Sequence, residues 1–298
     1  MPITLPPISR RRFLQSTAAL AGTAALPSLA WAQDEVVRPD PHRVALFSDT
    51  HIDRNPATTA GRDGINMSAY LRRCVEQVQR DGLPGNTLVC GDVAYSVGLK
   101  HDYFQFQSLV LPLLEKGVPV HCIMGNHDHV ERFFEAGVAA APETPPVEGK
   151  HITVVETPRA NWLLLDSLIQ TEVVWGELGA DQRTWLGETL DELGDEKPVL
   201  VMVHHNFDWV QNDGSDWGLR DAEPFFAELT ARQQVKAVFY GHSHKWEHHR
   251  RDDGLHLVNL PPTAYVFEAG RPNGWVDCAM EEDGLTLTLN CIDSRHQQ

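Results

Sequence analysis

Five short polar motifs, each directly behind an apolar run, carry the residue types that could do chemistry in this chain. They are Asp49-Thr50-His51, Gly91-Asp92, Gly125-Asn126-His127-Asp128, His204-His205 and Gly241-His242-Ser243-His244. A single Asp-x-His or Gly-Asp pair occurs in many turns and carries little information by itself. Five such motifs at the ends of successive runs are best explained by one shared metal site, because carboxylate and imidazole groups are common metal ligands.

The apolar runs before these motifs have the length and composition of buried strands. They cover residues 43–49, 86–92, 118–126, 198–205 and 235–242, and segments with helical spacing lie between them at 68–80, 102–116, 181–193 and 221–234. We expect Asp181 and Asp221 to be the N-caps of the last two helices. The alternation predicts an α/β fold, in which ligands bind beyond the carboxyl ends of the strands. The five motifs would meet there.

Further strands are expected outside this alternation. Residues 151–167 read as a strand pair that turns at Pro158-Arg159, and short strands with Gly- and Pro-marked turns follow from about Gly254. A hairpin around Asp283-Gly284 would carry Cys278 and Cys291 without placing them opposite one another. The five cysteines show no CxxC spacing, so no disulfide or zinc ribbon is assigned, and Cys90 and Cys122 are expected to be buried free thiols.

In this order, the five motifs resemble the pattern DxH, GD, GNH(D/E), H and GHxH of the calcineurin-like metallophosphoesterase superfamily. The resemblance extends from residue 49 to residue 244. It implies a four-layer αββα sandwich around two metal ions. Carried over by position, it assigns Asp49, His51 and His244 to one ion and Asn126, His204 and His242 to the other, with Asp92 bridging both.

General chemistry agrees with this assignment. A shared carboxylate can hold two divalent ions about 3.5–4 Å apart, so that they clamp the attacking and leaving oxygens of a phosphoryl group. Mixed imidazole and carboxylate ligands suit Fe, Mn or Zn rather than Ca. A hydroxide held between the ions would attack in line, and the resemblance implies that His127 donates a proton to the leaving oxygen. The expected reaction is hydrolysis of a small phosphodiester, with a cyclic nucleotide as one candidate.

The residues next to the motifs have other expected roles. Asp128 would hold its turn through backbone hydrogen bonds, and His129 would lie at the rim of the site. In "VMVHH" the family spacing V-x-x-H selects His204 as the ligand. His205 would then line the cleft or orient a ligand.

Tyr95, three residues after Asp92, separates branches of the superfamily. Purple acid phosphatases carry a tyrosine there whose phenolate binds ferric iron, which would make this chain a phosphomonoesterase with a ferric-tyrosinate centre. A tyrosine packed at the cleft floor is the other explanation.

Three other segments resemble the bacterial class III cyclic-nucleotide phosphodiesterase branch: "FSDTHI", residues 175–190 and "NLPPTAYVF" at 259–267. By contrast, "HHNF" at 204–207 departs from the HHPP that is usual in that branch. A non-catalytic metal- or ligand-binding module would lack a ligand or His127, and neither is missing.

A loop at residues 206–221 would help to shape the substrate pocket. Phe207, Trp209 and Trp217 would stack on a nucleobase or pack on the scaffold. Arg220 would meet a phosphate or form a surface ion pair.

The N-terminus has the features of a twin-arginine export signal. Arg10 and Arg11 precede a weakly apolar Ala/Leu stretch that closes with the small-x-small site Ala30-Trp31-Ala32. The stretch is shorter than the roughly 20 residues of a membrane span, so no stable membrane anchor is expected. Cleavage after Ala32 would leave residues 33–298 as one domain in the periplasm or secreted, and the export machinery would be a partner.

The charge of the chain limits its other partners. The formal net charge is −16, and residues 1–32 contain three arginines and no acidic residue, so the mature chain would be more acidic still. A surface this acidic repels other polyanions, which argues against binding a nucleic-acid polymer or an anionic lipid surface. A small phosphate-ester substrate would have to be attracted by local positive charge, for which bound metal ions are the obvious source.

Overall fold

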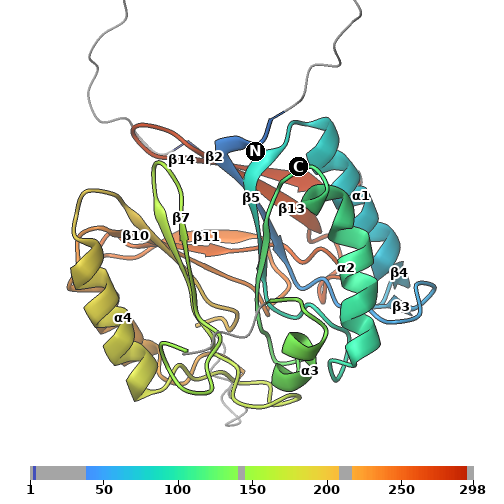
Figure 1. The fold of residues 1–298 in the computed structure, drawn as a ribbon, viewed down its shortest axis with the longest axis horizontal. Helices are drawn as coiled ribbons and strands as arrows, with labels where there is room; N and C mark the ends of the chain where they lie inside the picture. The colour runs from blue at the N-terminus through green and yellow to red at the C-terminus, as the bar shows by residue number, and fades with distance from the viewer. Residues whose placement is uncertain (1–2, 5–37, 140–144, 208–216, 294–298) are drawn as a thin grey trace, which may run out of the picture.

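Two six-stranded sheets form the centre of the fold (Figure 1). The computed structural model describes residues 3–4, 38–139, 145–207 and 217–293. The first sheet has the order β1-β14-β13-β2-β5-β6, with bounds Ile3–Thr4, Leu285–Cys291, Gly274–Met280, Asp40–Ser48, Pro84–Cys90 and Val120–Ile123. The second has the order β11-β12-β10-β9-β8-β7, with bounds Glu247–Arg250, His256–Asn259, Val235–Tyr240, Val199–Met202, Asn161–Leu164 and Thr153–Glu156. A small hairpin joins β3 (Thr59–Ala60) to β4 (Ile65–Asn66).

Helices cover the outer face of each sheet. They are α1 (Met67–Arg80), α2 (Lys100–Leu114), α3 (Val130–Glu135), α4 (Ala180–Leu193) and α5 (Ala222–Thr230). In Figure 1, α1 and α2 stand on one flank and α4 stands on the opposite flank, with the strands between them. Within the described ranges, no helix combines the length and apolar character needed to cross a membrane.

The core has three layers, which follow from the two-residue alternation of side chains along a strand. In β2, Ala45 and Phe47 pack with the side chains of α1 and α2, whereas Val44 and Leu46 pack between the sheets against residues of β9 and β10. Strand β9 likewise divides its side chains between this middle layer and a third layer under α4 and α5. The predicted four-layer αββα sandwich is therefore confirmed.

The central strands are parallel and bring the predicted motifs to one edge of each sheet. Strands β2, β5 and β6 pair in parallel in the first sheet, as do β8, β9, β10 and β12 in the second. Antiparallel partners flank them, including the predicted pair β7–β8 and the hairpin β13–β14. In that hairpin Cys278 lies opposite Leu287 and Cys291 opposite Gly274, as expected. Cys90 and Cys122 are buried free thiols, which confirms that prediction.

The predicted helix caps need correction. Gly179 occupies the N-cap position of α4, so Asp181 is not its cap and lies in the first turn, where an acidic side chain favours the positive end of the helix dipole. Asp221 does occupy the N-cap position of α5, but its side chain makes no capping bond there. Its carboxylate instead accepts the backbone N–H groups of Leu178 and Gly179, each at 3.0 Å, at the entrance of α4. Helix α5 also ends at Thr230, four residues before the predicted end.

Candidate metal centre

All seven predicted ligands lie just beyond the carboxyl ends of parallel strands and are buried. Their exposed fractions are 7% or less; the residues are Asp49, His51, Asp92, Asn126, His204, His242 and His244. Six of them, all but Asn126, contribute ligand atoms to sets of three, among them Asp49 with His51 and His244, and Asp49 with Asp92 and His204, in which all atoms lie within 4.8 Å of one another. Residues from strands far apart in the sequence are thus assembled into one polar cluster.

Asp92 lies between the two predicted ligand sets. Its Oδ2 is 3.6 Å from Nε2 of His51, which belongs to the first set, and 3.5 Å from Nε2 of His204, which belongs to the second. In the first set, Nε2 of His244 is 3.5 Å from Oδ1 of Asp49 and 3.0 Å from Nε2 of His51. This is the arrangement expected of a carboxylate that two cations share.

Several buried ligand atoms have no hydrogen-bond partner among the described residues. They are Nε2 of His204, Nε2 of His242 and Oδ1 of Asn126. The other ring nitrogen of His204 donates to the carbonyl of Cys90 at 2.9 Å, and Nδ1 of His244 donates to the carbonyl of Tyr265 at 2.5 Å. These bonds leave the Nε2 atoms of both rings facing the cluster, as in metal-binding histidines. Buried polar atoms without partners are costly, so the donor set fits a pair of divalent cations.

Backbone strain is concentrated at the same residues. Among the described residues, seven non-glycine positions have positive φ, and five of them are Asp49, His51, Asp92, His242 and His244, with φ between 46° and 67°. This left-handed conformation costs roughly 1–2 kcal/mol per residue, and such strain is typical of functional sites.

Two motif glycines are required by close contacts at the cluster. A Cβ on Gly125 would lie 2.2 Å from Oδ1 of Asp92, and a Cβ on Gly241 would lie 2.1 Å from Oγ of Ser48. Distances this short exclude any side chain at either position. The glycines therefore let the strand ends approach closely enough to form the site.

Burial keeps two of the imidazoles neutral. It lowers the pKa of His51 to about 3 and that of His242 to about 4. Neutral imidazole is the form that binds a cation, so both rings are ready to act as ligands near neutral pH.

The two carboxylates are anionic although they are buried. Burial raises the pKa of Asp49, but the attraction of His244, the hydrogen bond with it and the attraction of His204 together outweigh burial and lower that pKa to about 2. The pKa of Asp92 is likewise held well below its usual value, because burial is outweighed chiefly by the positive charge of His204. In return Asp92 raises the pKa of His204 to about 9 against the effect of burial. The cluster therefore offers anionic oxygens to a cation.

His127 is held beside the cluster but is less buried than the ligands. Its backbone N–H donates to Oδ1 of Asp92 at 2.9 Å, and its Nδ1 donates to the carbonyl of Ser96 at 2.6 Å. Its ring lies edge-on to that of His51, with centroids 5.1 Å apart. With Nδ1 engaged, Nε2 is the ring nitrogen that can exchange a proton with a substrate. The role of general acid stays a prediction.

Asp128 holds the turn that carries Asn126 and His127. Its carboxylate accepts the backbone N–H groups of Val93, Ala94 and Gly125 at 2.9–3.1 Å. Burial, and then repulsion by Asp92, raises its pKa to about 6, so it is an anionic acceptor at neutral pH. The predicted bracing role is confirmed. His129, in contrast, is half-buried and occupies the N-cap position of α3, outside the ligand sets.

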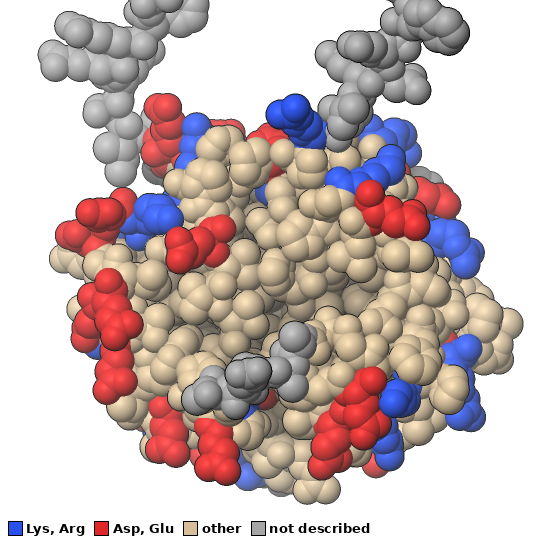
Figure 2. Space-filling view, viewed as in Figure 1, with Lys and Arg blue, Asp and Glu red and all other residues tan. Residues whose placement is uncertain are grey.

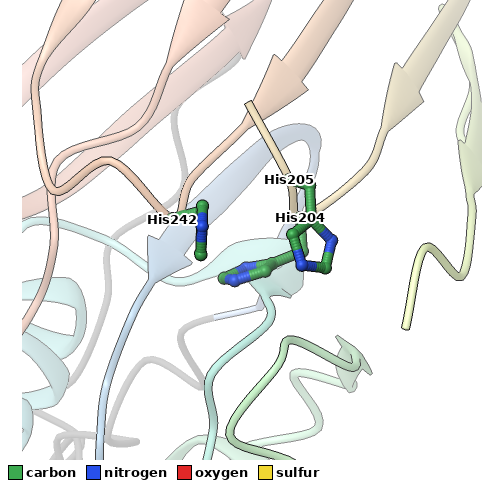
Figure 3. A group of neighbouring side chains, drawn as sticks. All are labelled: His204, His205 and His242. Carbon is green, nitrogen blue, oxygen red and sulfur yellow. The ribbon is translucent and has the colours of Figure 1, made fainter. Parts of the chain in front are cut away.

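His204 and His205 are both fully buried, and together with His242 they form another of the four sets of three possible ligands found among the described residues (Figure 3). Nδ1 of His205 is 2.7 Å from Oγ of Ser167, and its ring centroid is 4.9 Å from that of His242. The ring thus packs beside the ligands, as expected for a residue that lines the cleft or orients a ligand. The contact between His204 and Asp92 favours His204 as the ligand, and this choice stays a prediction.

The other residues for which the sequence allows two roles lie outside the predicted ligand sets. Tyr95 is half-buried and lies edge-on to His51, with ring centroids 6.5 Å apart. Phe207 packs on the scaffold against Phe226 and Tyr240, with centroids 4.7 Å and 5.0 Å apart. The guanidinium of Arg220 stacks on Trp175 at 4.0 Å. Trp217 is half-buried, and Trp209 lies outside the described residues.

Two aromatic residues beside the centre received no role from the sequence. Tyr265 stacks on His51 with centroids 5.2 Å apart, and Phe267 stacks on His244 with centroids 4.1 Å apart and ring planes at 10°. Both lie in the segment 259–267 that resembles the phosphodiesterase branch. Only the fold brings this segment against the ligands, so spacing could not reveal the contact.

The charge on the molecular surface agrees with the need for local positive charge at the site. On the face shown in Figure 2, charged side chains gather near the periphery, and the centre is mainly uncharged. With a net charge of −16, the chain does not attract an anionic substrate by itself.

Comparisons with known proteins agree with this geometry. A probable cyclic nucleotide phosphodiesterase of Synechococcus sp. is 30% identical over 231 residues, which cover 74% of this chain and 84% of that protein. A probable cyclic nucleotide phosphodiesterase of Psychrobacter arcticus is 29% identical over 168 residues, covering 54% of this chain but only 58% of that protein. A dimetal phosphatase from Danio rerio has the same fold, with a TM-score of 0.66 at 16% identity over 85% of this chain and 97% of the other.

Two family models match the chain. A model of the twin-arginine translocation signal matches residues 7–27, which confirms the predicted export signal. The cleavage site after Ala32 lies outside the described residues and stays a prediction. The model of the calcineurin-like phosphoesterases matches residues 42–246, which include all five motifs. The chain therefore belongs to the calcineurin-like phosphoesterase family.

Proposed function

We propose that this exported protein hydrolyses small phosphodiesters, including cyclic nucleotides, with a dinuclear metal centre. The observation that carries the proposal is the convergence of buried ligand atoms on both sides of Asp92, of which those of Asn126, His204 and His242 have no hydrogen-bond partner among the described residues. Relatives named as probable cyclic nucleotide phosphodiesterases support the substrate class.

The centre would take two transition-metal ions, of which Fe, Mn and Zn suit the ligands. Asp49, His51 and His244 would hold one ion, Asn126, His204 and His242 the other, and Asp92 both. When bound, such a pair polarises a phosphoryl group and lowers the pKa of the attacking water.

His127 would protonate the oxygen that leaves phosphorus. Its Nδ1–H is fixed on the carbonyl of Ser96 at 2.6 Å, so the ring presents Nε2 in a defined orientation. Its backbone is tied to Oδ1 of Asp92, which couples the position of the acid to that of the bridging carboxylate. An imidazole is suited to this role because its unperturbed pKa lies near neutrality.

A substrate panel tests the proposal. The mature protein, metal-loaded and after chelation, would be assayed with 3′,5′-cyclic AMP, bis-p-nitrophenyl phosphate, glycerophosphoethanolamine and p-nitrophenyl phosphate. We expect diester hydrolysis that disappears on chelation and returns with Mn²⁺, with kcat/KM higher for diesters than for the monoester. Activity that survives complete metal removal, or activity on the monoester alone, would contradict the proposal.

A further inference from the structure

Phe267 is an exposed aromatic ring in direct contact with the candidate metal centre. It stacks almost parallel on His244, with centroids 4.1 Å apart, yet 46% of the residue is exposed. In the part of the chain that the structure describes, Phe104 is the only other large aromatic residue exposed to a similar degree, at 44%, and it lies on the outer helix α2. An exposed aromatic at the edge of a polar site offers an apolar surface for a ligand.

The segment before Phe267 is held firmly against the end of β2. The backbone N–H groups of Thr263 and Ala264 donate to the carbonyls of Ser48 and Asp49, at 2.7 Å and 3.2 Å. The carbonyl of Tyr265 accepts a hydrogen bond from Nδ1 of His244. The segment is therefore hydrogen-bonded to two residues of the first ligand set, Asp49 and His244.

The residues after Phe267 are tied to the last motif by ion pairs. Glu268 pairs with Lys245 at 3.4 Å and with Arg271 at 3.0 Å, and Arg271 also pairs with Glu247 at 3.0 Å. Exposed pairs contribute little stability individually, but together they restrict this turn. The ring is thus placed in advance and does not have to be ordered by a ligand.

We propose that Phe267, backed by His244, is the stacking surface for the nucleobase of a cyclic nucleotide whose phosphate binds at the metal centre. This inference rests on the function proposed above and adds the part of the substrate that is recognised. A nucleoside cyclic phosphate is compact, since one sugar ring separates the phosphate from the base. Every base has a flat π face, so stacking would accept purines and pyrimidines alike.

The test compares substrates with and without a base. Phe267→Ala should raise KM for 3′,5′-cyclic AMP about tenfold, equivalent to ~1.4 kcal/mol, with little change in kcat. KM for glycerophosphoethanolamine, which has no ring, should stay unchanged. Phe267→Trp should keep KM for cyclic AMP near the wild-type value, and Phe104→Ala, which removes an exposed phenylalanine far from the centre, should change neither substrate.

Two measurements that do not depend on turnover complete the test. Calorimetric binding of the product AMP should weaken about tenfold in Phe267→Ala, whereas binding of inorganic phosphate should not change. Metal content, measured by mass spectrometry, should equal that of the wild type. Loss of metal, or an equal loss with both substrates, would mean that the ring only shields His244 and would overturn the inference.

The remaining outcomes separate the two proposals. An unchanged KM for cyclic AMP in Phe267→Ala overturns the stacking role and leaves the phosphodiesterase proposal intact. If the wild type hydrolyses bis-p-nitrophenyl phosphate but no cyclic nucleotide, the stacking role and the cyclic-nucleotide part of the proposed function are both overturned, and only the metal-dependent phosphodiesterase remains. A metal-loaded wild type that hydrolyses no diester at all refutes the proposed function itself.

Discussion

Asp128→Asn should destabilise the protein and impair the site although Asp128 is not one of the predicted metal ligands. Oδ2 of Asp128 accepts the N–H groups of Val93 and Gly125, and Oδ1 accepts the N–H of Ala94 and the hydroxyl of Tyr103. Whichever way an asparagine amide is turned, its NH₂ faces two of these donors. Two buried donors therefore lose their acceptor.

The expected cost follows from the two donors that lose their acceptor. A buried donor without a partner costs roughly 1–3 kcal/mol, so the free energy of unfolding should fall by about 2–6 kcal/mol. In a domain of this size, that corresponds to a decrease in Tm of roughly 4–24 °C. Because Asn126 and His127 lie in the same turn, a displacement of about 1 Å should lower kcat roughly 100-fold.

Urea unfolding followed by circular dichroism, together with steady-state diester hydrolysis, would measure both effects. The matched control is Asp191→Asn, which breaks an exposed ion pair with Arg232 on the surface of α4 and should cost at most about 1 kcal/mol. If Asp128→Asn matched this control in both stability and kcat, the bracing role of Asp128 would be refuted.

Three further predictions concern the proposed general acid His127, Tyr95 and the twin-arginine signal. His127→Ala should lower kcat about 10²–10⁴-fold for a diester with an alkoxide leaving group, but far less for bis-p-nitrophenyl phosphate, whose leaving group needs little protonation. An equal loss on both would exclude the general-acid role. We expect colourless enzyme and little change in kcat for Tyr95→Phe, because Tyr95 packs edge-on to His51; a visible charge-transfer band lost in that variant would establish a ferric-tyrosinate centre instead. Changing Arg10 and Arg11 to lysine should retain the precursor in the cytoplasm, and immunoblots that find it exported as before would contradict the assigned signal.

The sequence was most informative where apolar runs end in polar motifs. The centres of runs such as 43–49 and 235–242, at residues 44–47 and 237–240, are buried on both faces, which makes them continuously apolar and easy to recognise as central strands. The carboxyl ends of parallel strands lie at the same edge of a sheet. The sequence alone could therefore predict that Asp49, Asp92 and His242 lie close together.

Features set by contacts between distant segments were not predictable. Asp221 stands where a cap of α5 is expected, yet its carboxylate serves the entrance of α4, because the fold places Leu178 and Gly179 beside it. Phe207 could stack on a substrate or on the scaffold by its sequence alone, and the aromatic neighbours that decide this come from α5 and β10. The stacking of Phe267 on His244 depends on such tertiary packing as well.

The metal content of the purified mature protein tests the central claim most directly. Mass spectrometry should find about two transition-metal ions per chain in the wild type, as a dinuclear centre requires. Asp92→Asn removes the charge of the shared carboxylate and should retain about one ion or fewer, with diester hydrolysis abolished. Full occupancy by two ions together with undiminished hydrolysis in Asp92→Asn would contradict the two-metal account.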